Sequence, residues 1–383
     1  MVQNKNIKNH DIIVFGLEHY NPLGVLRSLG QEGIYPTLIT LKGRWPISEK
    51  SIYVKELHNV QTFDEGLELI QKKFGNAKPD ELPIIITCDD KTMQFLDVQY
   101  ESLADKFIIF NANGENGRIT KYMDKFEILK AAELNGLKIL PTQIVDRGVI
   151  PQDLEYPIIT KSISPNVGGW KSDVYICRSE EELKTASLKI KSPKVLIQKY
   201  IEKKNEYCID GFSVNQGRDT TFTIAATYNY LIPGYYSPFM TLENLNKPDL
   251  EAGMRKLIEY IGYEGIWCIE FLIDQDDNYY FTEVNFRNSG WSYASTKAGM
   301  NMPVLWIESI LNGKIDYEKA YSKIPEGFTA MVEPIDYQKR VIEGNTSFGE
   351  WLMDFKKADC GFYYDEVDTE PFFEMVRNWE HLN

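Results

Sequence analysis

Short apolar runs alternate with helical patterns through the first 110 residues, and this alternation limits the folds open to the chain. Strands that alternate with helices build a parallel sheet that is covered on both faces. We therefore predict an open α/β domain over residues 1–112. The expected strands are 11–16, 35–40, 83–87 and 107–110, and the expected helices run near 22–30 and 64–74.

The rest of the chain divides into three further segments. An amphipathic helix is expected within 120–142, with Gly136 as its stop signal. A smaller α+β piece follows Pro141, with strands at 157–163, 173–177 and 194–201 and a helix from Ser179. Strands then dominate, apart from a helix near 249–260, and the segment from about 314 to 383 contains no motif that we can interpret.

The composition argues against several classes of partner. The chain has 42 basic and 56 acidic residues, a net charge of -14, which disfavours an extended nucleic-acid surface and docking on anionic lipid. No apolar run approaches the ~18 residues of a membrane span, and the amino terminus lacks a signal-peptide core. We expect a cytoplasmic protein with no membrane insertion.

Cysteine and histidine usage narrows the chemistry. The five cysteines are odd in number and lie mostly in apolar runs, which is typical of reduced core thiols. The four histidines lie far along the chain from the polar hairpin described below, so a histidine metal site or general base is not expected there. The first turn, GLEHYNPLG, lacks the Gly-x-Gly-x-x-Gly spacing, which disfavours a dinucleotide-dependent oxidoreductase.

The stretch FTEVNFRNSG (281–290) carries an unusual set of polar side chains. Successive side chains of a strand point to opposite faces, so Glu283, Asn285 and Arg287 share one face and the apolar residues between them share the other. Such a face, lined by a carboxylate, an amide and a guanidinium, indicates a ligand site on an otherwise apolar strand.

The preceding strand, GIWCIEFLID (265–274), is expected to pair with this stretch as a hairpin. If Asp274 pairs with Tyr279 across the turn QDDN, the antiparallel register places Glu270 opposite Glu283. Two carboxylates ~4 Å apart at an effective dielectric near ~20 repel by about 4 kcal/mol, whereas a cross-strand pair normally contributes under ~1 kcal/mol. The hairpin therefore requires a compensating positive charge.

That charge can come from a bound cation or from a neighbouring basic side chain such as Arg287. Glu270, Glu283 and Asn285 offer only oxygen ligands, which suit Mg²⁺ completed by water and phosphate oxygens. The set indicates nucleotide chemistry, with Arg287 facing developing negative charge. A solvent-facing charged hairpin with a salt bridge is the alternative.

Two lysines add weaker signals for phosphate binding. Lys161 ends a strand before a loop that contains Gly168 and Gly169, whose backbone N–H groups could close over phosphate oxygens. Lys125 follows Asp124 at the start of a helix, where an anion meets both the lysine and the helix N-terminus. A surface hairpin and ordinary surface charge are the alternatives.

An apolar strand also leads into Gln198-Lys199-Tyr200-Ile201 and then, past a charged loop, to Glu206. The backbone N–H and C=O groups of such a connector can form hydrogen bonds with the edge of a nucleotide base, and Glu206 can accept hydrogen bonds from ribose hydroxyls. Taken alone, this segment is better interpreted as an ordinary strand and loop.

In chain order these pieces resemble the ATP-grasp superfamily of carboxylate–amine ligases, over roughly residues 11–310. The resemblance implies an amino-terminal α/β domain, a small α+β lid, and a carboxy-terminal α+β domain with an antiparallel sheet, with ATP held between the last two. The implied limits are 1–112 for the first domain, 113–140 for a linking helix, 141–204 for the lid and 205–383 for the ATP, Mg²⁺ and acceptor domain.

The resemblance also implies individual roles. Lys125 and Lys161 match the two phosphate-contacting lysines, Lys161 with a catalytic role, and Glu270, Glu283 and Asn285 match the Mg²⁺ ligands. Arg287 matches the arginine that steadies the acyl phosphate. The remaining implied contacts are Gly168 and Gly169 in the lid loop, Gln198, Lys199, Tyr200 and Ile201 at adenine, Glu206 at ribose, and Arg287, Asn288, Ser289 and Gly290 at the substrate.

The sequence departs from the family pattern at two places. Gln198 stands where the connector often begins with Glu. After Arg287 the chain lacks the His-Pro sequence of biotin-dependent carboxylases, which disfavours that branch. The segment NSGWSYASTKAGMNMP is closer to ligases that join amino acids in cell-envelope or peptide-like products, including D-aspartate ligases.

The resemblance implies an ADP-forming ligase that makes an amide through an acyl phosphate. Its cofactors would be ATP and Mg²⁺, with Mn²⁺ as a substitute, and its substrates an amino acid and a carboxylate or peptide-like molecule. A homodimer is compatible with this class. A non-catalytic ATP-binding protein and an AMP-forming ligase are the alternatives. No general base stands out, and the Tyr-rich loop 228–239 either lines the acceptor site or packs elsewhere.

Overall fold

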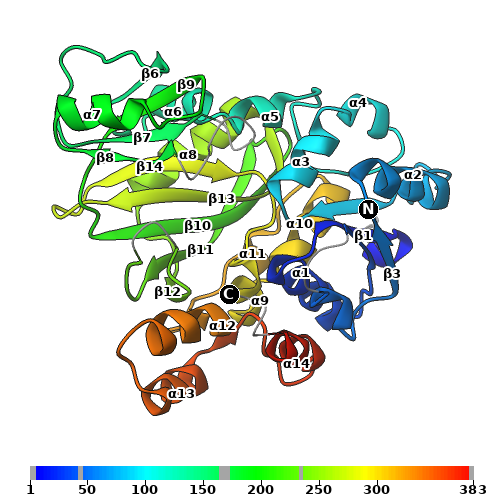
Figure 1. Ribbon diagram of the computed structural model, residues 1–383. Helices are drawn as coiled ribbons and strands as arrows, with labels where there is room; N and C mark the ends of the chain where they lie inside the picture. Colours follow the sequence, from blue (N-terminus) through cyan, green and yellow to red (C-terminus); the bar gives the residue numbers. More distant parts are fainter. Residues whose placement is uncertain (1–5, 42–45, 164–172, 233–235, 379–383) are drawn as a thin grey trace.

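The computed structural model describes residues 6–41, 46–163, 173–232 and 236–378. Figure 1 shows a blue amino-terminal domain beside a large green and yellow sheet, with a small green lid above that sheet and an orange and red segment below it. One sheet is parallel and the other two are mainly antiparallel. The expected three-part α/β architecture is confirmed.

The amino-terminal domain holds a parallel sheet in the order β3-β2-β1-β4. The expected strand at 107–110 is wrong, because only a single bridge joins Ile84 to Ile108. β3 was not predicted, because it is a short edge strand in which polar residues alternate with Leu57 and Val60 and only Val60 is buried. The elements are β1 Ile12–Leu17, α1 Tyr20–Gln31, β2 Thr37–Leu41, β3 Glu56–Val60, α2 Phe63–Phe74, β4 Ile84–Thr87, α3 Asp90–Asp97 and α4 Tyr100–Leu103.

The linking segment contains two helices, α5 Arg118–Tyr122 and α6 Lys125–Leu134, in place of the single helix expected. Asp124 separates them, because its side chain accepts hydrogen bonds from the backbone N–H groups of Phe126 (2.9 Å) and Glu127 (3.2 Å) and so caps α6. The stop signal is located as predicted: Gly136 adopts a φ of 86° just after α6 ends.

The lid is a four-stranded antiparallel sheet in the order β6-β9-β7-β8, with one helix against it. Its buried side chains, including Leu183 and Ile197, form a small core of their own. The short, half-exposed edge strand β6 was not predicted. The elements are β6 Thr142–Asp146, β7 Ile158–Ser162, β8 Ile176–Cys177, α7 Glu180–Ser187 and β9 Lys194–Lys199.

The large sheet runs in the order β14-β13-β10-β11-β12-β15-β16, and β5 pairs with the start of β13. α10 packs on β10 and β13, and α1 of the first domain packs on α9 and α10. The sheet and α1 therefore share one continuous core. The elements are β5 Asn111–Ala112, β10 Asn205–Val214, β11 Asp219–Tyr228, β12 Phe239–Glu243, α8 Pro248–Ile261, β13 Tyr263–Ile273, β14 Tyr279–Asn285, α9 Ser292–Lys297 and α10 Met302–Asn312.

The segment after residue 314, which the sequence left uninterpreted, ties the large sheet to the first domain. Arg27 of α1 is fully buried. Its guanidinium donates to the Asp368 carboxylate (2.9 Å) and to the carbonyls of Phe362 (3.1 Å) and Tyr363 (2.8 Å). These acceptors compensate a charge that burial would otherwise make costly. The elements are α11 Tyr317–Ala320, β15 Thr329–Met331, α12 Glu333–Tyr337, α13 Phe348–Lys357, β16 Cys360–Gly361 and α14 Glu370–Arg377.

Two expectations from composition can be compared with the fold. All five cysteines are buried and free, which confirms core thiols. None of the helices in the described residues is both long enough and apolar enough to cross a membrane.

Candidate active site

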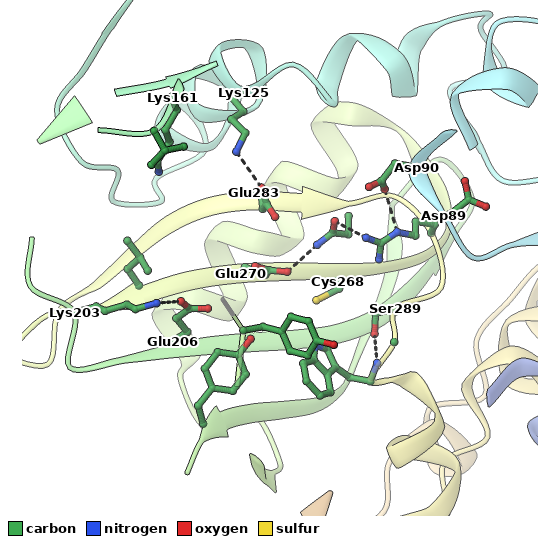
Figure 2. A pocket seen from close by; sticks show the side chains of 18 of the residues that line it. Asp89, Asp90, Lys125, Lys161, Lys203, Glu206, Cys268, Glu270, Glu283 and Ser289 are labelled. Atoms are coloured by element: carbon green, nitrogen blue, oxygen red, sulfur yellow. Dashed lines mark hydrogen bonds and ion pairs between the residues drawn. The ribbon is translucent and has the colours of Figure 1, made fainter. Parts of the chain in front are cut away.

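A cavity of about 990 Å³ lies where the lid, the large sheet and the first domain meet. Figure 2 shows Lys125 and Lys161 above the strands of the large sheet, with Glu270 and Glu283 below these lysines. The walls include side chains from β7 and β9 of the lid, from β10, β13 and β14 of the large sheet, and from the turns after β1 and β4. The cavity therefore collects charged groups from all three parts of the chain.

The hairpin of β13 and β14 places Glu270 directly opposite Glu283, as predicted. The route to this register differs from the expected one, because Ile273, not Asp274, pairs with Tyr279. A bulge beside Glu270 then restores the register. Thr282 is the extra residue, and its hydroxyl donates to the Glu270 carbonyl at 2.8 Å. The one-residue shift at the turn and the one-residue bulge at Thr282 thus cancel, so that Glu270 and Glu283 are still paired.

The two carboxylates are held by different neighbours. The Asn285 amide donates to Glu270 Oε1 at 2.8 Å, and Lys125 Nζ lies 3.7 Å from Glu283 Oε2. Burial raises the pKa of Glu270 to about 8, and the charges of Glu283 and Glu206 act in the same direction. The site is therefore short of positive charge near Glu270.

This donor set fits a hard divalent cation. Among the described residues no group of three or more His, Cys, Asp or Glu side chains could hold a metal by itself. Glu270, Glu283 and Asn285 supply two carboxylates and an amide, so other ligands would have to complete the shell. Mg²⁺ is usually bound in this way, by one or two carboxylates together with water and phosphate oxygens.

Arg287 joins the large sheet to the first domain. Its Nε donates to Asp90 Oδ1 at 3.0 Å and its Nη2 donates to Asn285 Oδ1 at 2.9 Å. The arginine therefore does not neutralise the glutamate pair directly, and Lys125 provides the contact to Glu283 instead. Its side chain is 18% exposed, at the wall of the cavity.

Lys161 of β7 faces the cavity from the lid. Its Nζ donates to Gln198 Oε1 at 3.0 Å, and the Gln198 amide donates to the Thr142 hydroxyl at 2.9 Å. Burial, followed by the charge of Lys125, lowers the pKa of Lys161 to about 8. Gly168 and Gly169 lie outside the described residues.

The connector after β9 also lines the cavity through Lys199, Tyr200 and Ile201. The backbone N–H of Lys199 donates to the Pro141 carbonyl, and the Lys199 ammonium contacts lid carbonyls at 3.2 Å. Glu206 of β10 forms an ion pair with Lys203, a cavity residue that the sequence reading missed. Figure 2 shows this pair at the opposite side of the cavity from Asp89 and Asp90.

The residues after Arg287 divide into two groups. Ser289 and Gly290 line the cavity, and the Ser289 hydroxyl donates to the buried Asp210 carboxylate at 2.5 Å. Asn288 does not line the cavity. It is fully buried and its amide donates to Asn21 Oδ1 at 2.5 Å. The expected substrate contact by Asn288 is therefore corrected to a bond between the large sheet and the first domain.

The expectation that every histidine lies far from the hairpin is wrong for His19. His19 lines the same cavity as Arg287, and its Nδ1 accepts a hydrogen bond from the Asn21 N–H at 3.4 Å. Burial, followed by the charge of Arg287, lowers the pKa of His19 to about 4. The imidazole is therefore neutral at pH 7, and its Nε2 carries the proton.

Three carboxylates that the sequence reading missed enter the cavity from the first domain. Glu18 follows β1, and Asp89 and Asp90 follow β4, which pairs with β1. The carboxyl ends of neighbouring parallel strands are the usual ligand edge of an open α/β sheet. The predicted strand ends at 16 and 87 were therefore a signal that could have located these residues.

Two of these carboxylates are fixed by hydrogen bonds. Glu18 accepts from the backbone and hydroxyl of Ser48, and burial raises its pKa to about 7. Asp89 caps α3 and accepts from the Leu17 N–H at 2.9 Å and the Thr92 hydroxyl at 2.7 Å. Asp90 is 52% exposed and contacts Arg287.

Comparison with known proteins finds sequence similarity over the segment that contributes most of this site. Residues 123–305 match the family model described as the carbamoyl-phosphate synthase L chain, ATP binding domain. A pyruvate carboxylase subunit of Methanothermobacter thermautotrophicus is 28% identical over 194 residues, which are 45% of this chain and 38% of that protein. The match thus spans less than two fifths of the length of that relative.

Solved structures share the fold over most of the chain. N5-carboxyaminoimidazole synthetase from Staphylococcus aureus superposes with a TM-score of 0.63 at 15% identity, covering 90% of this chain and 88% of that one. L-amino acid ligase from Bacillus licheniformis gives a TM-score of 0.60 at 13% identity, covering 81% of this chain and 76% of that one. These likenesses concern the fold alone.

The three-part fold and the matched ATP-binding region together define the class. The chain has the fold of these ATP-grasp structures, and residues 123–305 are similar in sequence to an ATP-binding domain.

Proposed function

We propose that this protein is an ATP- and Mg²⁺-dependent carboxylate–amine ligase that forms an amide through an acyl phosphate and releases ADP and phosphate. One observation carries the proposal: Glu270, Glu283 and Asn285 lie beside Lys125, Lys161 and Arg287 around a single cavity. Opposed carboxylates flanked by cations suit the binding of a metal–triphosphate complex. We keep 141–204 as the lid and 205–383 as the ATP and acceptor domain.

In the first step of the reaction one anion, the substrate carboxylate, must attack another anion, the triphosphate of ATP, against electrostatic repulsion. A substrate carboxylate oxygen attacks the γ-phosphorus of ATP, the bond to ADP breaks, and an acyl phosphate forms. An amine nitrogen then attacks the acyl carbon, and phosphate leaves with the electron pair of the C–O bond. The ammonium form of the amine gives up two protons in all, one to phosphate and one to solvent. Mg²⁺ would neutralise phosphate charge when it is bound by Glu270, Glu283 and Asn285.

The residues of the chain have separate parts in this scheme. Lys161 and Lys125 hold phosphate oxygens, and Arg287 holds the carboxylate that becomes the acyl group. Lys199, Tyr200 and Ile201 bind adenine, and Glu206 binds ribose. The lid, including Gly168 and Gly169, excludes water from the acyl phosphate. Ser289 and Gly290 contact the acceptor.

The finer proposal concerns the substrates. We propose that the enzyme joins an amino acid to a carboxylate or peptide-like molecule, which the fold likeness to an L-amino acid ligase supports. A D-aspartate-ligase-like modification of a cell-envelope product is the second candidate, favoured by the segment that follows Arg287.

The test is the release of ADP and phosphate from Mg·ATP in the presence of pooled amino acids and carboxylates. We expect release with a particular sub-pool and its loss in Glu283→Ala. Glu308→Gln is the control, since Glu308 lies outside the cavity and forms an ion pair with Lys319. AMP as the product would contradict the acyl-phosphate route. Mg²⁺-dependent ATP binding without turnover in any pool would favour a binding protein.

A further inference from the structure

The two ends of the cavity differ in charge. The lysines that line it in the described residues are Lys125, Lys161, Lys199 and Lys203, and all four belong to the lid, the linking segment or the start of the large sheet. At the other end the first domain contributes the three carboxylates of Glu18, Asp89 and Asp90. Figure 2 shows Lys203 and Asp89 on opposite sides, with Glu270 between them. Arg287 is the one lysine or arginine among the described cavity residues at this acidic end.

Four aromatic side chains line the same cavity as these carboxylates. Tyr236 packs edge-on against Trp291 with ring centroids 5.6 Å apart, and Tyr228 lies 6.2 Å from Trp291. The Tyr20 hydroxyl donates to the Tyr236 hydroxyl at 3.4 Å. Phe362 supports Trp291 from behind at 5.7 Å. We call Tyr20, Tyr228, Tyr236 and Trp291 the aromatic wall; all four line the cavity.

Asp90 is the carboxylate at this end that substrate binding can redirect. Glu18 and Asp89 already hold backbone N–H groups and hydroxyls of the first domain. Asp90 instead contacts Arg287, the side chain that the proposed donor carboxylate would occupy. When that donor binds Arg287, the Asp90 carboxylate is left facing the cavity beside the new acyl group.

The carboxylates at this end of the cavity favour a second substrate that carries a positive charge. A phosphorylated acceptor would bring negative charge to Asp89, Asp90 and the partly protonated Glu18, which a single arginine balances only in part, and like charges at this range repel strongly. An ammonium ion is attracted by the same carboxylates and by the faces of Tyr and Trp rings. An apolar or ring-shaped body would bury its surface on the aromatic wall.

We propose that the acceptor is an amine that arrives as an ammonium ion with an aromatic or apolar body, bound between Asp90 and the aromatic wall, and that it is not a phosphorylated compound. This inference rests on the proposed ligase function and specifies the substrate class of the same site. Asp90 acts as a specificity-determining residue, because its negative charge favours the binding of a cationic acceptor over an anionic one.

The experiment compares three probes on the full-length protein in the presence of Mg·ADP, by isothermal titration calorimetry. Phenethylamine is cationic and aromatic, 3-phenylpropionate is anionic and aromatic, and ribose 5-phosphate carries a phosphate. We expect phenethylamine to bind at least about tenfold more tightly than ribose 5-phosphate, because opposite charge replaces like charge. Tighter binding of ribose 5-phosphate than of phenethylamine would overturn the proposal.

The variant Asp90→Asn gives a signature that a folding defect cannot imitate. Phenethylamine affinity should fall about fivefold to tenfold, because its counter-ion is lost. 3-Phenylpropionate affinity should rise by about the same factor, because Arg287 is released from its partner. Asp105→Asn, an exposed aspartate of the same domain outside the cavity, should change neither. A fall of both affinities in Asp90→Asn, or no change in either, would overturn the role of Asp90.

Two outcomes separate this inference from the proposed function. ADP release that depends on a phosphorylated acceptor would refute this inference and leave the proposed ligase function intact. Absence of Mg·ADP binding in the wild-type protein would refute the ligase and, with it, the inference.

Discussion

The lid and the large sheet face each other across one cavity, yet they are built differently. The lid sheet surrounds a small core of its own, whereas the large sheet shares a continuous core with α1 of the first domain. Glu270 and Glu283 stand on the large sheet and Arg287 follows the end of β14, whereas Lys161 and Gln198 stand on the lid. The proposed metal ligands thus rest on the more deeply packed element, and Lys161, one of the two proposed phosphate contacts, rests on a sheet with a separate core.

The largest expected effect is a difference in which kinetic constant changes when Arg287, beside the large sheet, or Lys161, on the lid, is replaced. Arg287→Met should lower kcat by about 10³-fold, raise the KM for the donor carboxylate and leave ADP affinity within about threefold, because the arginine holds that carboxylate and the charge that develops on it in the reaction. Lys161→Met should mainly raise the KM for ATP, by about tenfold, because the lysine holds phosphate in the ground state. Steady-state kinetics of ADP release and ADP titrations measure both.

The lid variant Arg147→Met, at an exposed position outside the cavity, is the control for these measurements. Loss of ADP binding in Arg287→Met would contradict the division of roles between sheet and lid.

A matched pair of core substitutions tests whether the lid unfolds separately. Ile269 of β13 and Ile197 of β9 are both buried, but in different cores. Each change to Ala should cost about 2–5 kcal/mol. Ile269→Ala should lower the main unfolding transition, whereas Ile197→Ala should speed hydrogen exchange within 142–199 and leave β10 and β13 protected. Equal acceleration in β10 and β13 by Ile197→Ala would mean that the two sheets unfold together.

The pH dependence of nucleotide binding should originate mainly on the lid. The pKa of Lys161 is lowered to about 8 in the free protein, so its charge is present below pH 8 and is lost as the pH rises through that value. Metal-free ADP affinity should therefore fall by about threefold to tenfold between pH 7 and pH 9. Titrations in EDTA measure this decline.

Lys161→Met should retain only the smaller part of that decline, which comes from Glu270, whose pKa is also raised to about 8 by burial. If the ADP affinity of Lys161→Met fell between pH 7 and pH 9 as much as that of the wild type, the pH dependence would originate from Glu270 on the large sheet.

The smallest expected effect concerns Gln198, which bridges Lys161 and Thr142. Gln198→Glu places a carboxylate beside the lysine and should raise the Lys161 pKa, so the decline in ADP affinity moves above pH 8. The change in unfolding free energy should stay within about 1 kcal/mol, because the Thr142 hydroxyl can donate to the new carboxylate. Gln198→Leu, which removes the acceptor without adding charge, should lower the pKa instead.

The sequence predicted the fold where local patterns are strong. β1, β2, β4 and α2 lie within two residues of their expected limits, because continuous apolar runs and helical periodicity identify buried strands and helices. β3 and β6 were missed since both are edge strands with polar or half-exposed residues. The carboxy-terminal segment gave no signal because β15 and β16 are too short to show a period.

The candidate site, like the fold, could be predicted only where it depends on local sequence patterns. The glutamate pair could be predicted because it depends on a local hairpin, although the bulge at Thr282 was needed to offset the longer turn. The contacts of Arg287 with Asp90 and of Asn288 with Asn21 could not, since they join residues 197 and 267 positions apart. Long-range polar contacts leave no periodic trace in the chain.

The buried position of Arg27 has a consequence for the order in which the molecule is made. Its carboxylate partner, Asp368, lies 341 residues further along the chain. During synthesis the first domain emerges long before that acceptor exists, so α1 cannot bury its guanidinium with compensated charge until the chain as far as Asp368 has left the ribosome. The amino-terminal α/β domain is thus translated well before the segment that completes its packing.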